Sequence, residues 1–148
     1  MSTYTQIIYQ IVFGTKYREK TLEKRNRDEL FKYITGLLQK KQCHVYQIGG
    51  VEDHIHILTH LHPTVALSSL VKDIKMASTD YIKRENLFPQ FQGWQNGYGA
   101  FTYSIREKDR LIEYIKGQEQ HHHKRSSKEE YMLMLKEEAV EYDEKYFL

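Results

Sequence analysis

The alternation of apolar and polar positions predicts β-strands in the first half of the chain. Residues 4–13 (YTQIIYQIVF) are dense in β-branched and aromatic side chains, and Gly14 ends this run. Residues 43–51 and 54–61 have the same character and are separated only by residues 52–53, a turn short enough to make the two strands antiparallel neighbours.

Apolar residues at helical spacing predict a helix between the first two strands. It covers residues 25–41, and Asn26 with Glu29 three positions later resembles a capping pair at its start. A last strand is expected within residues 94–105 (WQNGYGAFTYSI), where aromatic residues and turn-forming residues mix.

Two more helices follow from the same spacing. One is expected to open at Pro63-Thr64 and to stop near Asn86, and the other spans residues 107–118. The order β-α-β-β-α-β is that of the ferredoxin-like arrangement. The sequence therefore predicts an α+β fold with a four-stranded antiparallel sheet and an additional C-terminal helix.

A single domain and a tail account for the 148 residues. We expect a catalytic domain over residues 1–120 and a tail over residues 121–148. The tail has enough apolar residues for an amphipathic helix and an apolar end, and we expect it to dock on the domain or on a partner subunit. These apolar residues are Tyr131, Met132, Leu135, Tyr142, Tyr146 and Phe147.

Composition excludes several classes of protein. The longest apolar runs are far shorter than the roughly 20 residues that cross a bilayer, so no membrane association is expected. A single cysteine, Cys43, forms no internal disulfide, which suits a reducing cytoplasm. We therefore expect a cytoplasmic protein.

Charge is distributed unevenly along the chain. Residues 14–27 hold six Lys and Arg against two Glu, whereas residues 129–148 hold seven acidic residues against two Lys. A positive stripe on an almost neutral protein suits a phosphate backbone, although a solvated charged surface explains it equally well.

His54-Ile55-His56 is the sharpest candidate for chemistry. Residues two apart on a strand face the same side, with their backbones about 6.6 Å apart, so both imidazoles can approach one metal ion. His60 shares that face but lies about 20 Å from His54 along a straight strand, too far for shared coordination. Two histidines on an exposed sheet face also occur without any metal.

Tyr114 and Gln118 form a second pair. Four residues apart on a helix, they present a phenol and an amide on one side. The spacing alone is weak, since Tyr114 also suits the apolar stripe of Leu111 and Ile115.

Taken together, these motifs resemble the IS200/IS605-type transposases, the single-tyrosine branch of the HUH endonucleases, and their REP-associated relatives. The resemblance covers about residues 4–120 and has its motifs in the family's order. They are VFGTKYREK, GGVEDHIHIL, LSSLVKDIKMAS, WQNGYGAF and YIKGQ.

The resemblance implies roles for particular residues. His54 and His56 match the HUH motif and would bind the metal, together with Gln118, while Tyr114 matches the nucleophile. The implied reaction cleaves and rejoins single-stranded DNA with hairpin ends through a 5′-phosphotyrosine intermediate. The implied cofactor is Mg²⁺ or Mn²⁺, and the implied assembly is a homodimer.

Recognition of DNA falls to other side chains. The basic run offers phosphate contacts and Trp94, with Tyr98 and Phe101, offers rings for stacking on unpaired bases, although aromatic residues also pack under helices. The basic residues are Lys16, Arg18, Lys20, Lys24, Arg25 and Arg27. Three consecutive histidines, 121–123, are expected to touch phosphates or to mark the end of the helix.

Two other functions compete with the transposase. A domesticated module could bind hairpin DNA or RNA without cutting it, but it has no need of His54, His56, Tyr114 and Gln118 together. A 2H-type phosphoesterase needs two H-x-T/S motifs, and the chain has one H-x-H instead.

Overall fold

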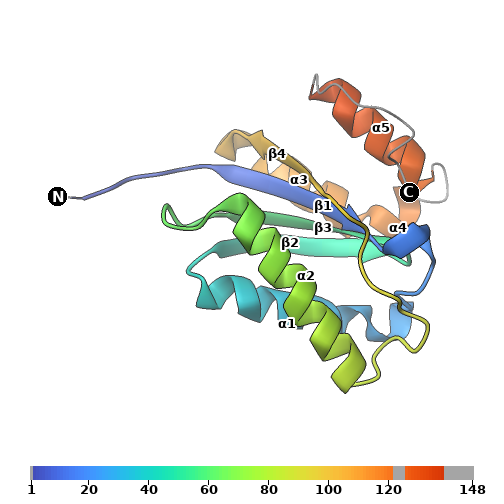
Figure 1. Cartoon of the computed structure of the whole chain (residues 1–148). Coiled ribbons are helices and arrows are strands. Elements are labelled where there is room, and N and C mark those ends of the chain that lie inside the picture. Colours follow the sequence, from blue (N-terminus) through green and yellow to red (C-terminus); the bar gives the residue numbers. More distant parts are fainter. Residues whose placement is uncertain (1, 122–125, 139–148) are drawn as a thin grey trace.

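Antiparallel strands form the centre of the computed structural model, which describes residues 2–121 and 126–138 (Figure 1). Within them a four-stranded sheet has the order β2-β3-β1-β4. This topology confirms the predicted α+β, ferredoxin-like fold. The strands are β1 (Ile8–Gly14), β2 (His44–Val51), β3 (His54–His60) and β4 (Gly99–Tyr103).

Two long helices cover one face of the sheet. They are α1 (Lys24–Lys40) and α2 (Leu67–Arg84), and Figure 1 shows both on the same side. Ile55 and Ile57 of β3 point into this layer and are fully buried there. Burial of apolar side chains at about 25 cal/mol per Å² is the main force that holds the layer to the sheet.

The opposite face is covered by the C-terminal elements. These are α3 (Lys108–Lys116), the short α4 (Gln118–His121) and α5 (Ser127–Glu137). Apolar residues of β1 and β3 pack on α3, and apolar residues of β1 and β4 pack on α5. The two small clusters are Ile8, Leu58, Leu111 and Ile115, and Val12, Phe101, Met134 and Leu135.

Several predicted boundaries differ from the structure. The first strand begins at Ile8, so residues 4–7 lie outside it. The helix expected from Pro63-Thr64 begins instead at Leu67, because residues 62–65 form a turn in which the amide of Val65 donates to the carbonyl of His62.

The predicted capping pair of the first helix is wrong. Glu23 occupies the N-cap position of α1 and makes no side-chain cap. The Asn26 side chain donates instead to the carbonyl of Leu87, which ties α1 to the segment that follows α2.

The helix predicted over residues 107–118 is interrupted at Gly117. This residue is the C-cap of α3, and Gln118 begins α4. His122 and His123 and the apolar residues Tyr142, Tyr146 and Phe147 lie outside the described residues. Among the described helices, none combines the length and the apolar character that a bilayer span needs.

Candidate active site

Strand β3 places His54 and His56 on the face of the sheet that α3 and α5 cover. Their side chains are buried, with exposed fractions of 6% and 0%, and their ring centroids are 5.0 Å apart. Ile55 between them points to the opposite layer, as the alternation of a strand requires. The strand thus separates the core from the polar site.

A hydrogen bond orients each imidazole. Nδ1 of His54 lies 2.9 Å from the Asp53 carboxylate, and Nδ1 of His56 lies 2.8 Å from the side-chain oxygen of Gln10. The Gln10 amide nitrogen donates to the hydroxyl of Tyr103 at 3.2 Å, which keeps its oxygen towards His56. Because both Nδ1 atoms face acceptors, Nε2 of each ring is left to face the space between them.

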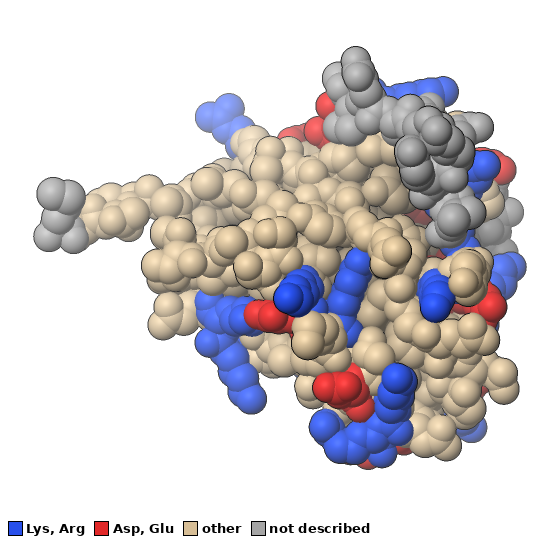
Figure 2. Space-filling view, in the orientation of Figure 1, with Lys and Arg blue, Asp and Glu red and all other residues tan. Residues whose placement is uncertain are grey.

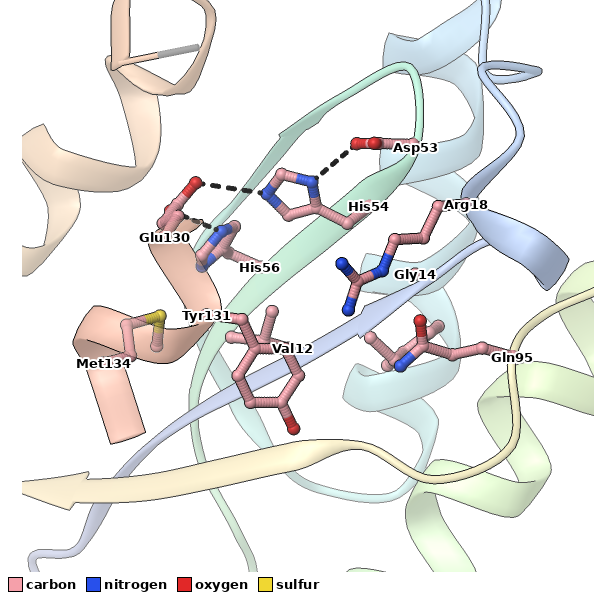
Figure 3. A pocket seen from close by; sticks show the side chains of 11 residues that line it. Val12, Gly14, Arg18, Asp53, His54, His56, Gln95, Glu130, Tyr131 and Met134 are labelled. Atoms are coloured by element: carbon pink, nitrogen blue, oxygen red, sulfur yellow. Dashed lines mark hydrogen bonds and ion pairs between the residues drawn. The ribbon is translucent and has the colours of Figure 1, made fainter. Parts of the chain in front are cut away.

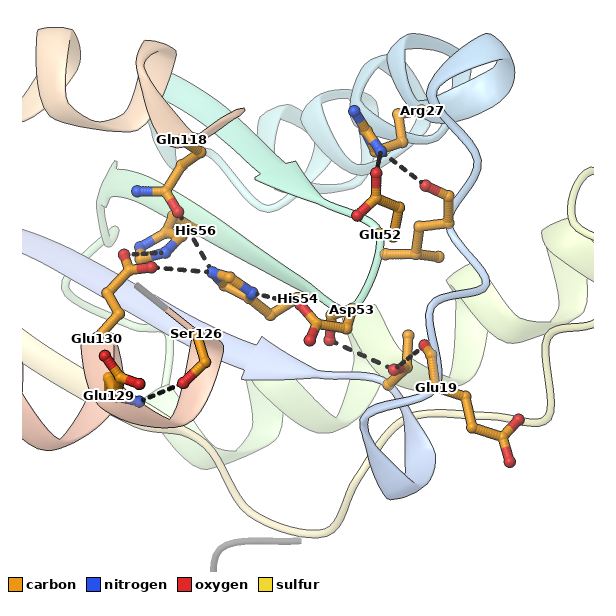
Figure 4. Close-up of polar contacts among 12 residues, drawn as sticks. Glu19, Arg27, Glu52, Asp53, His54, His56, Gln118, Ser126, Glu129 and Glu130 are labelled. Carbon is orange, nitrogen blue, oxygen red and sulfur yellow. Dashed lines mark hydrogen bonds and ion pairs between the residues drawn. The ribbon is translucent and has the colours of Figure 1, made fainter. Parts of the chain in front are cut away.

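Gln118 and Glu130 meet the two histidines at this point (Figure 4), and the Tyr114 hydroxyl reaches the same carboxylate. Oε1 of Gln118 lies 3.2 Å from Nε2 of His54. The Glu130 carboxylate lies 3.5 Å from Nε2 of His54 and 3.2 Å from Nε2 of His56. The hydroxyl of Tyr114 donates to the same carboxylate, and its ring centroid is 5.9 Å from that of His56.

A glycine lets the tyrosine-bearing helix approach this closely. A Cβ atom on Gly49 of β2 would lie 2.6 Å from the carbonyl oxygen of Ile115 and 2.8 Å from its side chain. Only a residue without Cβ allows that contact. Because Tyr114 directly precedes Ile115, this contact places the phenol beside the histidines.

Burial and charge shift the pKa values of the site. Burial by itself lowers the pKa of His54, but the hydrogen bonds and negative charges of Asp53 and Glu130 outweigh it and raise that pKa to about 9. Burial raises the pKa of Tyr114 far above its ordinary value, and the charge of Glu130 raises it further. The phenol is therefore protonated at neutral pH.

The donor set fits a divalent cation. One ligand atom each from His54, His56 and Glu130 lie within 4.8 Å of one another. With Oε1 of Gln118 they are all electron-pair donors, aimed at one buried point. Such a cluster is stable only with a proton or a cation between its members, and imidazole and carboxylate ligands suit Mn²⁺ and tolerate Mg²⁺.

A pocket with about 340 Å³ of space, open mouth included, adjoins the histidines (Figure 3). One wall belongs to β1 and β3, and another to Glu130, Tyr131 and Met134 of α5. The Arg18 side chain reaches into the pocket, and Gln95 lines it from the segment before β4.

The basic residues predicted to contact DNA differ in their exposure. Figure 2 shows Lys and Arg side chains spread over the face on which α1 and α2 lie. Lys16 and Lys20 are exposed, and Lys24 and Arg25 are exposed with acidic neighbours, Glu119 at 3.1 Å and Glu23 at 3.9 Å.

Arg27 departs from the expectation of a DNA-facing surface. Its side chain is only 4% exposed and donates to the carbonyl of Leu22 and to Glu119, each at 2.8 Å. These bonds hold the start of α1 against α4, so the guanidinium serves the fold.

Trp94 departs from the same expectation. The residue is 9% exposed, and its indole N–H donates to the Ser78 hydroxyl at 2.9 Å. Its ring meets Phe13 and Phe91 edge to face at centroid distances of 5.0 Å. Packed among these partners, the ring is part of the core cluster on this side of the sheet. Phe101 is buried as well, whereas Tyr98 is half-buried.

His54, His56, Tyr114 and Gln118, which are all predicted from the sequence, meet in the structure, but their partners Glu130, Asp53 and Gln10 are not predicted from it. Glu130 lies in an acidic stretch of the sequence, and no spacing there distinguishes one carboxylate from the next, so the sequence does not single it out. Asp53 directly precedes the H-x-H motif, and that adjacency was a usable signal. Gln10 was not, because it lies in another strand and only the sheet register brings it to His56.

Comparisons with known proteins identify the family of this chain. The family described as "Transposase IS200 like" matches residues 3–118. The ISDra2 transposase TnpA of Deinococcus radiodurans is 25% identical over 118 residues, which cover 76% of this chain and 84% of that protein.

Two solved structures share the fold, each with a TM-score of 0.61. One, from Deinococcus radiodurans R1, is described as a candidate transposase; it is 22% identical, with 80% of this chain and 95% of that chain covered. The other is a REP-associated tyrosine transposase bound to a REP hairpin; it is 16% identical, with 82% and 74% covered. Since the family match spans most of the chain, the protein belongs to the IS200-like transposases.

Proposed function

We propose that the protein cleaves and rejoins single-stranded DNA through Tyr114, with a divalent cation held at the paired histidines. The observation that carries this proposal is the meeting of the Tyr114 hydroxyl, Nε2 of His54 and Nε2 of His56 around one buried carboxylate. All of these groups come from one chain. A nucleophile and a set of metal ligands in contact are what phosphoryl transfer by a tyrosine requires.

His54, His56, Gln118 and Glu130 would hold the ion. Bound there, Mg²⁺ or Mn²⁺ would act as a Lewis acid on a phosphate oxygen. Asp53 and Gln10 would keep the two rings aimed at the ion through Nδ1, a role that such partners commonly fill at metal centres.

Tyr114 would act as the nucleophile. Its oxygen forms a bond to phosphorus while the bond from phosphorus to the 3′ oxygen breaks, which leaves a 5′-phosphotyrosine and a 3′-hydroxyl. The phenolic proton leaves, and the departing 3′ oxygen gains one. A 3′-hydroxyl from another strand reverses these steps, so joining needs no nucleotide cofactor.

The substrate we propose is single-stranded DNA with hairpin ends. A relative with the same fold is described as bound to a REP hairpin, and the exposed cations of residues 16–25 offer phosphate contacts. We propose that the protein works in the cytoplasm as a homodimer. Each chain has its own tyrosine beside its own histidines, so a dimer would contain two such sites.

The test is formation of a covalent protein–DNA adduct. The wild-type protein, incubated with a single-stranded hairpin end from DNA that flanks its coding region and Mn²⁺ or Mg²⁺, should give an adduct that survives denaturing electrophoresis. Tyr114→Phe should give none. Tyr33→Phe is the matched control, because Tyr33 stacks on Tyr81 in the opposite layer. An adduct with Tyr114→Phe would refute the proposal.

A module that binds hairpins without cutting them is the alternative. It predicts hairpin affinity with no adduct at any concentration of either metal. The convergence of four metal-binding groups on a phenol favours the enzyme.

A further inference from the structure

Arg18 differs from the other cations of the basic run. Arg27 is buried in bonds to Leu22 and Glu119, and Lys24 pairs with Glu119 at the surface. Of the Lys and Arg residues in the described part of the chain, Arg18 is the one that lines the histidine pocket. Its side chain points inward between β3 and α5 (Figure 3).

The backbone that delivers Arg18 is strained and firmly held. Tyr17 and Arg18 have φ values of 59° and 55°, in the left-handed region that side chains other than glycine rarely adopt. Such residues are energetically costly, and they persist where surrounding bonds fix them. The Thr15 amide donates to the carbonyl of Asp53 at 2.9 Å, and the Thr15 hydroxyl donates to the carbonyl of Glu19 at 2.6 Å.

One carboxylate links Arg18 to the histidines. Asp53 attracts the guanidinium, and its side chain also binds Nδ1 of His54 at 2.9 Å. Burial disfavours the charged form of Arg18 and lowers the pKa of its guanidinium. The fold therefore holds a cation in this pocket even though its desolvation is unfavourable. Arginine nonetheless stays protonated in proteins.

A phosphodiester in this pocket needs a cation beside the metal ligands, because Asp53 and Glu130 are both acidic. Guanidinium has five N–H donors in a planar fork, enough to serve Asp53 and two phosphate oxygens at once. We propose that Arg18 binds the non-bridging oxygens of the phosphate that Tyr114 attacks, an inference that rests on the function proposed above. Arg18 keeps its proton throughout, and it stabilises the charge on the equatorial oxygens as the new bond forms.

This contact can be tested by removing the charge of Arg18 and, separately, the charge of the phosphate. The variant is Arg18→Gly, because glycine adopts a φ of 55° without strain. The substrates are a DNA hairpin end with a normal phosphate at the cleaved bond and the same strand with a neutral methylphosphonate there. Single-turnover cleavage is measured at saturating DNA.

Arg18→Gly should slow cleavage of the normal phosphate by about 10²–10³-fold, the usual effect of removing one donor to the reacting oxygen. Both proteins should cleave the methylphosphonate at the same rate, because the charge that Arg18 binds is absent. Arg18→Lys keeps the charge without the fork and should fall between the two. Thermal unfolding checks that each variant folds.

Arg84→Ala is the matched control, since Arg84 is exposed at the end of α2 and lies outside the pocket. It should leave the single-turnover rate on both substrates unchanged. Equal losses by Arg18→Gly on both substrates, or no loss on either, would overturn the assignment of Arg18 and leave the proposed function intact. A wild-type protein that forms no adduct would overturn both.

Discussion

The hydroxyl of Tyr114 donates a hydrogen bond to the carboxylate of Glu130, which comes from a helix beyond the stretch that the family match covers. The same carboxylate faces Nε2 of both histidines. An acidic residue of the C-terminal segment therefore meets two histidines, a tyrosine and a glutamine that all lie in residues 54–118.

Removing the charge of Glu130 should lower the pKa of Tyr114 in metal-free protein. Glu130→Gln keeps a hydrogen-bonding group of the same shape but no longer opposes a phenolate. The difference in phenolate absorbance between each protein and its Tyr114→Phe derivative isolates this tyrosine. Glu129→Gln on the exposed side of α5 is the control and should leave the titration unchanged. An unchanged pKa in Glu130→Gln would contradict the contact.

Metal binding should depend on His56 and not on His60. His56→Ala removes a ligand at the centre of the cluster and should weaken Mn²⁺ binding by at least about 100-fold, since even supporting residues cost 10–100-fold. His60 lies at the other end of β3, where it bonds to Ile7. Calorimetric titration with Mn²⁺ makes the comparison, and equal affinity in both variants would exclude this ligand set.

Without metal, the protein should lose stability as pH rises from neutral to alkaline. The pKa of His54 is about 9 when folded and near 6.5 when unfolded, so its stabilisation is complete below pH 6.5 and is lost as pH rises through 9. The change corresponds to about 3 kcal/mol at most. Urea unfolding in EDTA measures it, and His54→Gln should flatten the dependence in this window. A pH-independent stability of the wild type would contradict the shift.

Gly49→Ala should impair both stability and cleavage. The added methyl group meets the carbonyl of Ile115, so α3 must move and carry Tyr114 with it. Overpacking of this kind costs about 1–3 kcal/mol. Gly36→Ala in α1 meets nothing within 4 Å and should stabilise the protein by up to about 1 kcal/mol. Urea unfolding and adduct formation compare the two, and full cleavage by Gly49→Ala would argue against the close approach.

Arg27→Ala should destabilise the protein without changing how salt affects DNA binding. It leaves the carbonyl of Leu22 without its charged donor and should cost about 1–3 kcal/mol. Arg25→Ala should instead leave the free energy of unfolding almost unchanged. It should reduce the slope of the logarithm of the binding constant against the logarithm of the salt concentration by about one. Binding titrations at several salt concentrations separate the two residues. A reduced slope for Arg27→Ala would place that residue at the DNA.

The sequence predicted the fold because its strands and helices have clear periodicities. The alternation in β3 placed Ile55 and Ile57 in the core and His54 and His56 on the other face, as the structure has them. Boundaries were harder, since Pro63 suits a turn as well as a helix start and a glycine ends α3 one residue before Gln118.

The site was only partly predictable from the sequence. His54 and His56 are neighbours in the chain, and Tyr114 and Gln118 lie one helical turn apart, so local spacing sufficed for both pairs. Glu130 and Gln10 reach the site only through packing and strand register. Trp94 and Arg27 are of residue types that also occur on DNA-binding surfaces, and their burial depends on Ser78, Glu119 and other distant partners.

One face of β3 carries core isoleucines and the other carries the histidines of the site, so the site forms only if β3 pairs with its neighbours in the correct register. In the observed register, His56 lies between Val12 and Gly49 and Ile55 lies between Phe13 and Gly50. A slip of one residue along β3 would exchange its two faces. The imidazoles would then point into the hydrophobic core under α1 and α2, and the isoleucines would point towards Tyr114. A molecule misfolded in this way would lack the site. The activity per milligram of a preparation should therefore reflect the fraction of molecules in which the strands pair in the observed register.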